Sequence, residues 1–312
     1  TGFSKEDFVK ISVSLKSLQS GKTRKKEVVL AVYLNKLRFG SSQTKIAQEF
    51  RLKSNVQVGD YIQSARAALG KDLVPKFKPE ALTKQTIENN TTELTRALFD
   101  PLAVLNGQKR PLYLVADGTY IACQKSGDNV KQRELYSGQK KKPLVSPFLV
   151  TTTNGYIVGA FGPFNPGMND AKRLEHILKT HREFFELITG PEYQTVFILD
   201  RGFRDVVPYL ESQGMKAFTP DLDTTCKQVP VERANLTRFV TKTRQVIERV
   251  NGRLKQKFQF LDGVLPNQSL CVLDQDILNM VALYNLCFKP LLTNAENWQS
   301  PKSWIKSVKV TL

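Results

Sequence analysis

The order of strand-like and helix-like segments after residue 110 is the feature that most limits the fold of this 312-residue chain. Three apolar runs with strand character come first, at 112–123, 142–153 and 156–164. A helix, a buried strand, a second helix, a short strand and a long helix are predicted to follow, at 171–188, 194–200, 204–214, 215–220 and 236–258. The switch between strand-like runs and helical spacing of apolar residues predicts a mixed α/β domain.

Two local signals predict how these strands pair. Asn154-Gly155, between the second and third runs, is a strong hairpin signal, so we expect these two strands to be antiparallel. The run QTVFILD at 194–200 is typical of a buried parallel strand, and the strand–helix–strand unit that it opens should cross over right-handedly. Together these features predict an RNase H-like mixed sheet.

The first part of the chain, residues 1–75, predicts a small all-α domain. Gly40 ends the first of three helical patterns, which cover 28–37, 42–50 and 56–69. Helix, short turn and helix at these lengths fit a helix-turn-helix, although a plain three-helix subdomain is an open alternative. The basic side chains that keep DNA binding open here are Lys45, Arg51, Lys53 and Arg66.

Two further segments complete the predicted domain organisation. Residues 76–110 should form a helical linker, with one helix over 83–99. Residues 111–312 should form the RNase H-like domain, which ends in a helical extension.

The charge balance predicts the kind of partner. The chain carries 46 Lys and Arg against 29 Asp and Glu, a formal net charge of +17. This excess favours a polyanionic partner, most simply nucleic acid, although a basic surface without a partner is an alternative. No uninterrupted apolar stretch reaches the roughly 18 residues of a membrane span, so we expect no membrane partner.

Cysteine and histidine usage narrows the chemistry. The four cysteines lie far apart without a CxxC pair, which indicates neither a zinc site nor a disulfide framework and favours a reducing compartment. The two histidines, His176 and His181, are spaced so that they do not share a helix face. Any catalytic metal should therefore be a hard, oxygen-bound cation, Mg²⁺ or Mn²⁺.

Three acidic residues stand where an RNase H-like fold would bring them together. Asp117 and Asp200 end the first and fourth predicted strands, which are neighbours in that fold, and Glu248 lies at the edge of the last helix's buried stripe. Ionised carboxylates ~4 Å apart repel by about 4 kcal/mol per pair at an effective dielectric of about 20. Two divalent ions would turn that repulsion into a site for phosphodiester cleavage. We therefore predict these three residues as catalytic metal ligands.

Each acid also has a structural interpretation. Asp117 precedes a glycine and fits a turn, and Asp200 fits the N-cap of the helix that follows. Glu248 fits an ion pair with Arg244, four residues earlier. The occurrence of all three acids in this strand order favours the catalytic interpretation.

Basic residues concentrate in two stretches beside the predicted site. One joins the first two strands, where Tyr136 could stack on a base, and the other is the last helix. A solvated charged surface is the alternative for such runs. The residues predicted to contact DNA are Lys125, Lys131, Arg133, Lys140, Lys141, Lys142, Arg244, Arg249, Arg253 and Lys255.

Five motifs around these residues, in this order, carry a family resemblance. They are ADGTY around Asp117, LYSGQKKKP at 135–143, GMNDAKRL around Asp170, ILDRGF around Asp200 and RQVIERVNGRLK around Glu248. Over roughly residues 112–257 the chain resembles the DDE superfamily endonuclease domain of PIF/Harbinger-type transposases and their domesticated relatives. The resemblance implies that Asp117, Asp200 and Glu248 are the metal-binding triad. The family often has His-Asp where this chain has Asn169-Asp170, so Asp170 is predicted only as an accessory residue of the site.

The same resemblance implies a biological role. It implies a transposase that cleaves DNA and transfers strands at transposon ends, using metal-activated water or a 3′-OH and two Mg²⁺ or Mn²⁺ ions. It also implies a nuclear location, a homo-oligomer and a Myb-like DNA-binding accessory protein. The alternatives are a domesticated DNA-binding or scaffold protein without cleavage activity, and an RNase H-like nuclease that acts on RNA.

Overall fold

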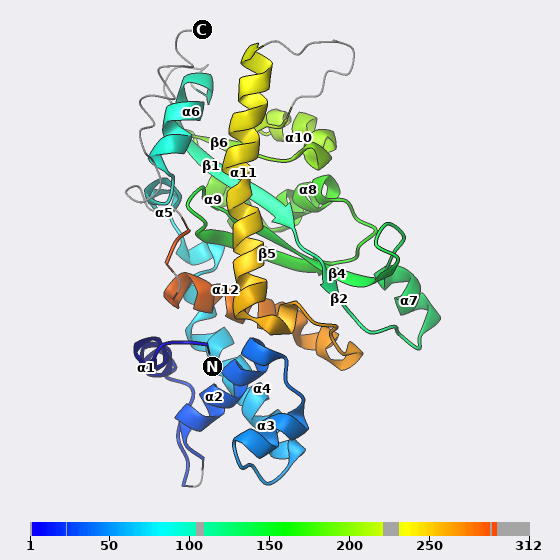
Figure 1. Cartoon of the computed structure of the whole chain (residues 1–312). Coiled ribbons are helices and arrows are strands. Elements are labelled where there is room, and N and C mark those ends of the chain that lie inside the picture. The colour runs from blue at the N-terminus through cyan, green and yellow to red at the C-terminus, as the bar shows by residue number, and fades with distance from the viewer. Residues whose placement is uncertain (1, 23, 104–108, 221–230, 288, 292–312) are drawn as a thin grey trace.

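A mixed β-sheet forms the centre of the molecule (Figure 1). The computed structural model describes residues 2–22, 24–103, 109–220, 231–287 and 289–291. Within these residues the sheet has seven strands. They are β1 Arg110–Gly118, β2 Ile121–Ala122, β3 Tyr136–Ser137, β4 Lys142–Thr151, β5 Ile157–Phe164, β6 Tyr193–Ile198 and β7 Lys216–Phe218.

The strand order is that of the RNase H-like class. The strands β5, β4, β1, β6 and β7 lie side by side, and the short strands β2 and β3 also pair with β4. β4 is antiparallel to β1 and β5, whereas β6 is parallel to β1 and β7. Gly155 has a φ of +90° at the tight turn between β4 and β5, a geometry that glycine adopts readily. The predicted fold class and the predicted hairpin are confirmed.

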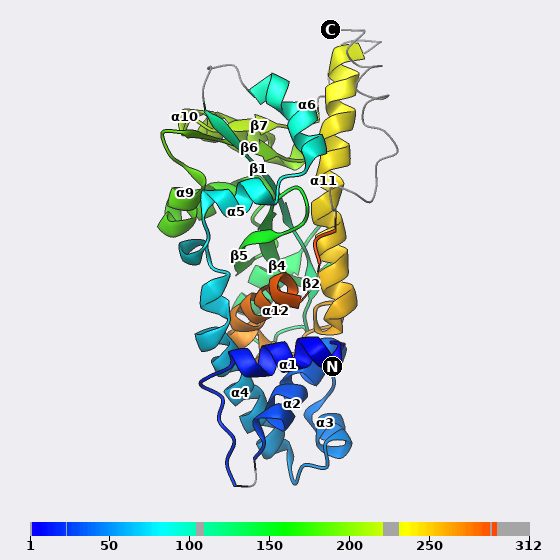
Figure 2. The ribbon, with the colours of Figure 1, turned by 90° about the vertical axis from the view of Figure 1, so that its left-hand side faces the viewer.

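Helices cover both faces of the sheet (Figures 1 and 2). The helices α8, α9 and α10 lie on one face, and the long helix α11 crosses the other. Side chains of β1 point alternately to the two faces of the sheet. Leu112 and Leu114 pack in the core on the α8 side, and Tyr113 and Val115 pack in the core on the α11 side. The helices of this part are α7 Asn129–Leu135, α8 Asp170–Thr180, α9 Arg182–Ile188, α10 Val207–Ser212, α11 Val231–Lys257 and α12 Leu273–Cys287.

The helices before the sheet share a core with it. One continuous cluster of buried apolar side chains joins α1–α4 to α11, α12 and the sheet. Ile87 of α5 joins the second cluster, on the α8 side of the sheet, so the predicted linker packs against the sheet as well. The domain boundaries stay a prediction, and the C-terminal extension beyond residue 291 lies outside the described residues. These helices are α1 Lys5–Ser14, α2 Lys26–Phe39, α3 Gln43–Glu49, α4 Asn55–Asp72, α5 Lys84–Asn89 and α6 Glu93–Ala103.

Local hydrogen bonding divides two helices that were predicted as continuous. The pattern over 83–99 forms α5 and α6, because the Asn90 side chain bonds the Thr86 carbonyl and the Thr92 hydroxyl accepts from the Thr95 N–H. The pattern over 171–188 forms α8 and α9, where His181 leaves helical geometry and packs its ring 4.8 Å from that of Phe161.

The segment between β1 and β4 also differs from the prediction. The first strand divides into β1 and β2 at Thr119, whose N–H bonds the Pro147 carbonyl of β4, because Pro147 has no N–H to return a second hydrogen bond. The polar stretch that follows contains α7, which the sequence pattern missed. Asp128 begins this helix by accepting from the N–H groups of Val130 and Lys131.

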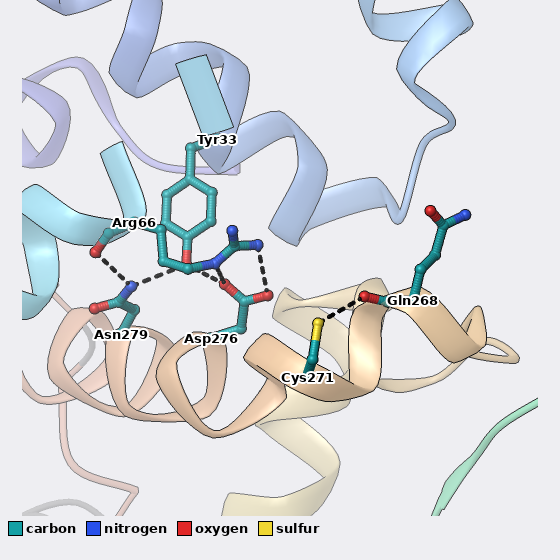
Figure 3. Close-up of polar contacts among 6 residues, drawn as sticks. All are labelled: Tyr33, Arg66, Gln268, Cys271, Asp276 and Asn279. Carbon is teal, nitrogen blue, oxygen red and sulfur yellow. Dashed lines mark hydrogen bonds and ion pairs between the residues drawn. The ribbon is translucent and has the colours of Figure 1, made fainter. Parts of the chain in front are cut away.

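A buried polar group, which we call the α12 cluster, fastens α12 to α2 and α4 (Figure 3). Arg66 of α4 makes two hydrogen bonds with Asp276 of α12, at 2.7 and 3.0 Å. Tyr33 of α2 donates to the same carboxylate at 2.5 Å, and Asn279 donates to the Tyr33 hydroxyl at 2.9 Å. Arg66, which the sequence left open as a DNA contact, is thus occupied inside the molecule.

One helical segment, Asn267–Cys287, is long and apolar enough to cross a membrane by length and composition. Sequence reading passed over it because polar residues such as Asn279 interrupt the apolar run. In this fold half of its most apolar window is buried, and its Asn285 side chain donates to the Ile157 carbonyl at 2.8 Å. The segment therefore serves here as a core helix.

Candidate active site

Asp117 and Asp200 lie at matching positions on neighbouring strands. Val115 of β1 pairs with Ile198 of β6, and each acid follows its member of this pair by two residues. Because side chains alternate along a strand, the spacing directs both acids to the face of Val115 and Ile198, which α11 covers. The predicted adjacency of their strands is confirmed.

Helix α11 brings three polar residues to the end of β1. Arg244, Glu248 and Asn251 follow one another at helical spacing. Arg244 and Glu248 form an ion pair, and the Asn251 amide donates to Asp117 Oδ2 at 3.2 Å. The Glu248 side chain keeps 50% of its surface exposed. Sequence reasoning missed Asn251, although a polar residue in a buried stripe three positions after Glu248 was a usable signal.

The acids crowd Asp117 electrostatically. Burial raises the pKa of Asp117 from 3.8 to about 7, and the negative charge of Asp170 contributes to that rise. The charges of Asp200 and Glu248 act in the same direction, and the charge of Arg244 opposes them. The structure thus brings all three predicted acids, and Asp170 as well, within electrostatic reach of one point.

Asp170 reaches the end of β1 from the opposite face of the sheet. It is the first residue of α8, and its carboxylate pairs with the buried Arg173 at 2.7 Å. A Cβ at Gly118 would overlap Asp170 Oδ1, so the residue after Asp117 has no room for a side chain. Asp170, predicted only as accessory, exerts the largest charge effect on Asp117.

Two structural interpretations hold alongside this convergence. Asp200 caps the 3-10 helix Arg201–Val206 by accepting from the Gly202 N–H at 2.7 Å. Glu248 is the ion-pair partner of Arg244. In the part of the chain that the structure describes, no three acidic, histidine or cysteine side chains stand close enough, as they lie, to hold one metal ion. The acids therefore surround the end of β1 without forming one ligand cluster, and local contacts hold Asp170, Asp200 and Glu248 separately.

The basic residues fall into two groups. Six are exposed on a projecting segment, residues 125–142, that includes α7 and that we call the basic arm (Figure 1). Arg249 is exposed on α11. By contrast, Arg253 donates to the Lys289 carbonyl at 2.5 Å and Lys255 to the Tyr120 carbonyl at 2.7 Å, which ties α11 to its neighbours. DNA contact by any of these residues stays a prediction. The six are Lys125, Lys131, Arg133, Lys140, Lys141 and Lys142.

The fold and the acids at the end of β1 define an RNase H-like domain with a carboxylate-rich site. The family model described as DDE superfamily endonuclease matches residues 116–285, more than half of the chain, and this range contains Asp117, Asp170, Asp200 and Glu248. The chain belongs to this DDE superfamily endonuclease family. No curated protein matches it.

Solved structures add weaker likenesses. The structure titled a pre-cleavage Mos1 transpososome is 12% identical, covers 76% of this chain and 81% of its own, and has a TM-score of 0.24. A Mos1 mariner paired end complex with Mn is 15% identical, covers 81% of this chain and 87% of its own, and has a TM-score of 0.22. These similarities are too distant to assign the site residues of this chain.

Proposed function

We propose that this protein is a divalent-metal-dependent DNA endonuclease of the Harbinger transposase type, with Asp117, Asp200 and Glu248 as its metal ligands. The observation that carries the proposal is the crowding of acids around Asp117 in a chain of net charge +17. Membership of the endonuclease family supports the chemistry. The proposed reaction is cleavage and strand transfer at transposon ends.

The groups around Asp117 suit a hard cation. The acids offer oxygen ligands, which Mg²⁺ and Mn²⁺ prefer. A further oxygen, Asn251 Oδ1, is buried and has no hydrogen-bond partner among the described residues. Burial and the surrounding acids raise the pKa of Asp117 despite the opposing charge of Arg244, so a bound cation would favour the ionised form of this carboxyl. For Glu248 to bind an ion, it would have to exchange Arg244 for the metal.

When bound, such ions would activate water or a 3′-OH and stabilise the leaving oxygen of the phosphodiester. The chain's own groups supply orientation and substrate binding. Asn251 orients the Asp117 carboxylate, and the Gly202 N–H orients that of Asp200. The exposed lysines of the basic arm would bind backbone phosphates and position the DNA.

Cleavage of supercoiled plasmid and of DNA oligonucleotides with Mg²⁺ or Mn²⁺ tests the proposal. We expect Asp200→Ala to lower the cleavage rate by about a thousandfold or more, because losing a ligand costs about 4 kcal/mol of transition-state stabilisation. Asp205→Ala is the matched control, since Asp205 is an exposed acid of the same 3-10 helix. Equal cleavage rates for the two variants would refute the assigned role of Asp200.

A domesticated protein that binds DNA without cutting it is the second candidate. The ion pair between Arg244 and Glu248 favours it, because this pair occupies one proposed ligand. It predicts salt-sensitive DNA binding and no metal-dependent cleavage by the wild-type protein. RNA oligonucleotides in the same assay would reveal a nuclease that acts on RNA instead.

The cellular setting is part of the same proposal and rests on the family resemblance. We infer a nuclear location, a homo-oligomer of two or more copies on DNA and a Myb-like DNA-binding partner. Light scattering of the protein with and without DNA tests the oligomer, and a constant monomer mass in both would exclude it.

A further inference from the structure

A buried arginine of α8 lies beside the candidate active site, on the face of the sheet opposite α11, and the function proposed above gives it no role. Arg173 of α8 has none of its surface exposed. Its guanidinium donates to Asp170 Oδ1 and Ser146 Oγ, each at 2.7 Å, and to the Asn165 carbonyl at 3.1 Å. A buried charge is costly unless it is paired and hydrogen-bonded, so these contacts fix the guanidinium and the carboxylate together.

Because Gly118 has no side chain, the pair of Asp170 and Arg173 can pack beside Asp117. A Cβ at position 118 would overlap the Asp170 carboxylate and would lie 2.7 Å from Arg173 Nη1 and 3.2 Å from Ser146 Oγ. The pair therefore packs directly on the backbone of the residue that follows Asp117. Asp170 is also the first residue of α8, where the helix dipole favours a negative charge.

We propose that Asp170 belongs to the cation site and that Arg173 is the positioning residue that holds it there. The inference rests on the proposed function, since it requires the site to bind a divalent ion. Arg173 fixes one Asp170 oxygen at 2.7 Å, so a fourth carboxylate stays in a set position at the end of β1. Losing a supporting partner of a metal site typically changes metal affinity by about 10- to 100-fold.

The competing role is a structural bridge, in which Asp170 serves only to neutralise Arg173. Mn²⁺ binding by the free protein separates the two roles. The electron paramagnetic resonance signal of aqueous Mn²⁺ falls as the ion binds, so the measurement needs neither DNA nor turnover. We expect Asp170→Asn and Arg173→Met each to weaken Mn²⁺ binding by about tenfold.

The paired variant D170N/R173M carries no charge at either position and decides between the roles. If Arg173 acts through Asp170, the pair should bind Mn²⁺ as weakly as D170N alone, because the two effects are not additive. If Asp170 only neutralises Arg173, D170N is weak because it leaves an unpaired positive charge near the site. The paired variant would then regain wild-type affinity, and the proposal would be overturned.

Two further variants complete the design. E175Q/K179M removes an exposed ion pair of 2.6 Å on the same helix, and we expect it to leave Mn²⁺ affinity unchanged. Ser146→Ala keeps both charges and removes one acceptor from Arg173, so it replaces the charge variants if they fail to fold. We expect it to weaken Mn²⁺ binding several-fold. Unchanged affinity in Ser146→Ala would count against the proposal.

The design also separates this inference from the function beneath it. Wild-type protein that binds no Mn²⁺ and cuts no DNA would overturn both. Wild-type protein that binds Mn²⁺ and cuts DNA, with D170N indistinguishable from it in Mn²⁺ affinity, would overturn the inference alone.

Discussion

Two buried groups of charged side chains in this molecule use the same residue types and are balanced differently. In the α12 cluster one acid, Asp276, meets one base, Arg66, at 2.7 Å, and Tyr33 donates a further hydrogen bond. At the end of β1, Asp117 experiences the charges of three other acids and of one base, Arg244. The first group is neutral within itself, whereas the second has an excess of negative charge.

The pKa directions show the consequence. Burial alone would lower the pKa of Arg66, but the hydrogen bond and charge of Asp276 raise it overall, so the charged form is favoured. The pKa of Asp117 rises to about 7, so its charged form is disfavoured while no cation is present. At Asp117 burial is the largest cause of the rise and the neighbouring acids add to it, whereas at Arg66 the single partner Asp276 outweighs burial. We infer that a structural cluster gives a buried charge an opposite partner, whereas a ligand site holds buried acids in excess.

The largest expected effect comes from unbalancing the α12 cluster. Asp276→Ala leaves Arg66 as an uncompensated charge whose side chain is only 14% exposed. We expect the free energy of unfolding to fall by about 3–5 kcal/mol, measured by denaturant unfolding. DNA cleavage per folded molecule should not change, because the cluster lies away from the end of β1.

Asp274→Ala is the matched control for this change, because Asp274 is an exposed acid of the same helix. We expect a loss within about 1 kcal/mol there, from the helix dipole. If Asp276→Ala lowered the free energy of unfolding by no more than Asp274→Ala does, the α12 cluster would not stabilise the fold, and its contrast with the acids at the end of β1 would fail.

A smaller effect is expected from relieving the excess charge at Asp117. The pKa of this residue in the folded protein, about 7, exceeds its ordinary value of 3.8. Its contribution to stability is therefore fully present below about pH 4 and is lost as the pH rises through about 7. Without metal, Asp117→Asn should gain about 2 kcal/mol over wild type between about pH 5 and pH 8.

Thermal melting across this pH range, without metal and with Mn²⁺, measures the effect. Mn²⁺ at high pH should stabilise the wild type and not Asp117→Asn, because the metal binds the deprotonated carboxylate. Asp205→Asn, at an exposed position, should show no pH-dependent gain. A gain for Asp117→Asn that is constant with pH would mean that the acids around it are not an unbalanced group.

The sequence predicted the parts of the molecule that are encoded locally. Alternation and apolar runs marked β1 and β6, and the ends of those strands marked Asp117 and Asp200. The α12 cluster was not predictable in this way, because Arg66 and Asp276 lie 210 residues apart and no local pattern relates them. The contact of Asp170 with Gly118 depends on how α8 packs against the sheet, and helical spacing alone does not specify that packing.

The smallest expected effect is on the salt dependence of DNA binding, and it comes from the unpaired lysines of the basic arm. The lysines of the basic arm are exposed, and within the described residues Lys140, Lys141 and Lys142 make no ion pair. Replacing all three with alanine should make the log–log dependence of DNA affinity on salt shallower by about 2–3, since each phosphate contact contributes about 0.9. Binding titrations over a range of NaCl concentrations measure this slope.

Two controls show whether unpaired charge is the cause. Replacing Lys71, Lys76 and Lys78, which are exposed and lie outside the basic arm, removes the same charge and should change the slope by less than about one. Lys255→Ala should also have little effect on the slope, because the Tyr120 carbonyl already holds this ammonium group at 2.7 Å. If the Lys255 variant flattened the slope as much as the triple variant, occupied and unoccupied charges would be equivalent in DNA binding, and charge balance would not separate structural side chains from ligand-binding ones.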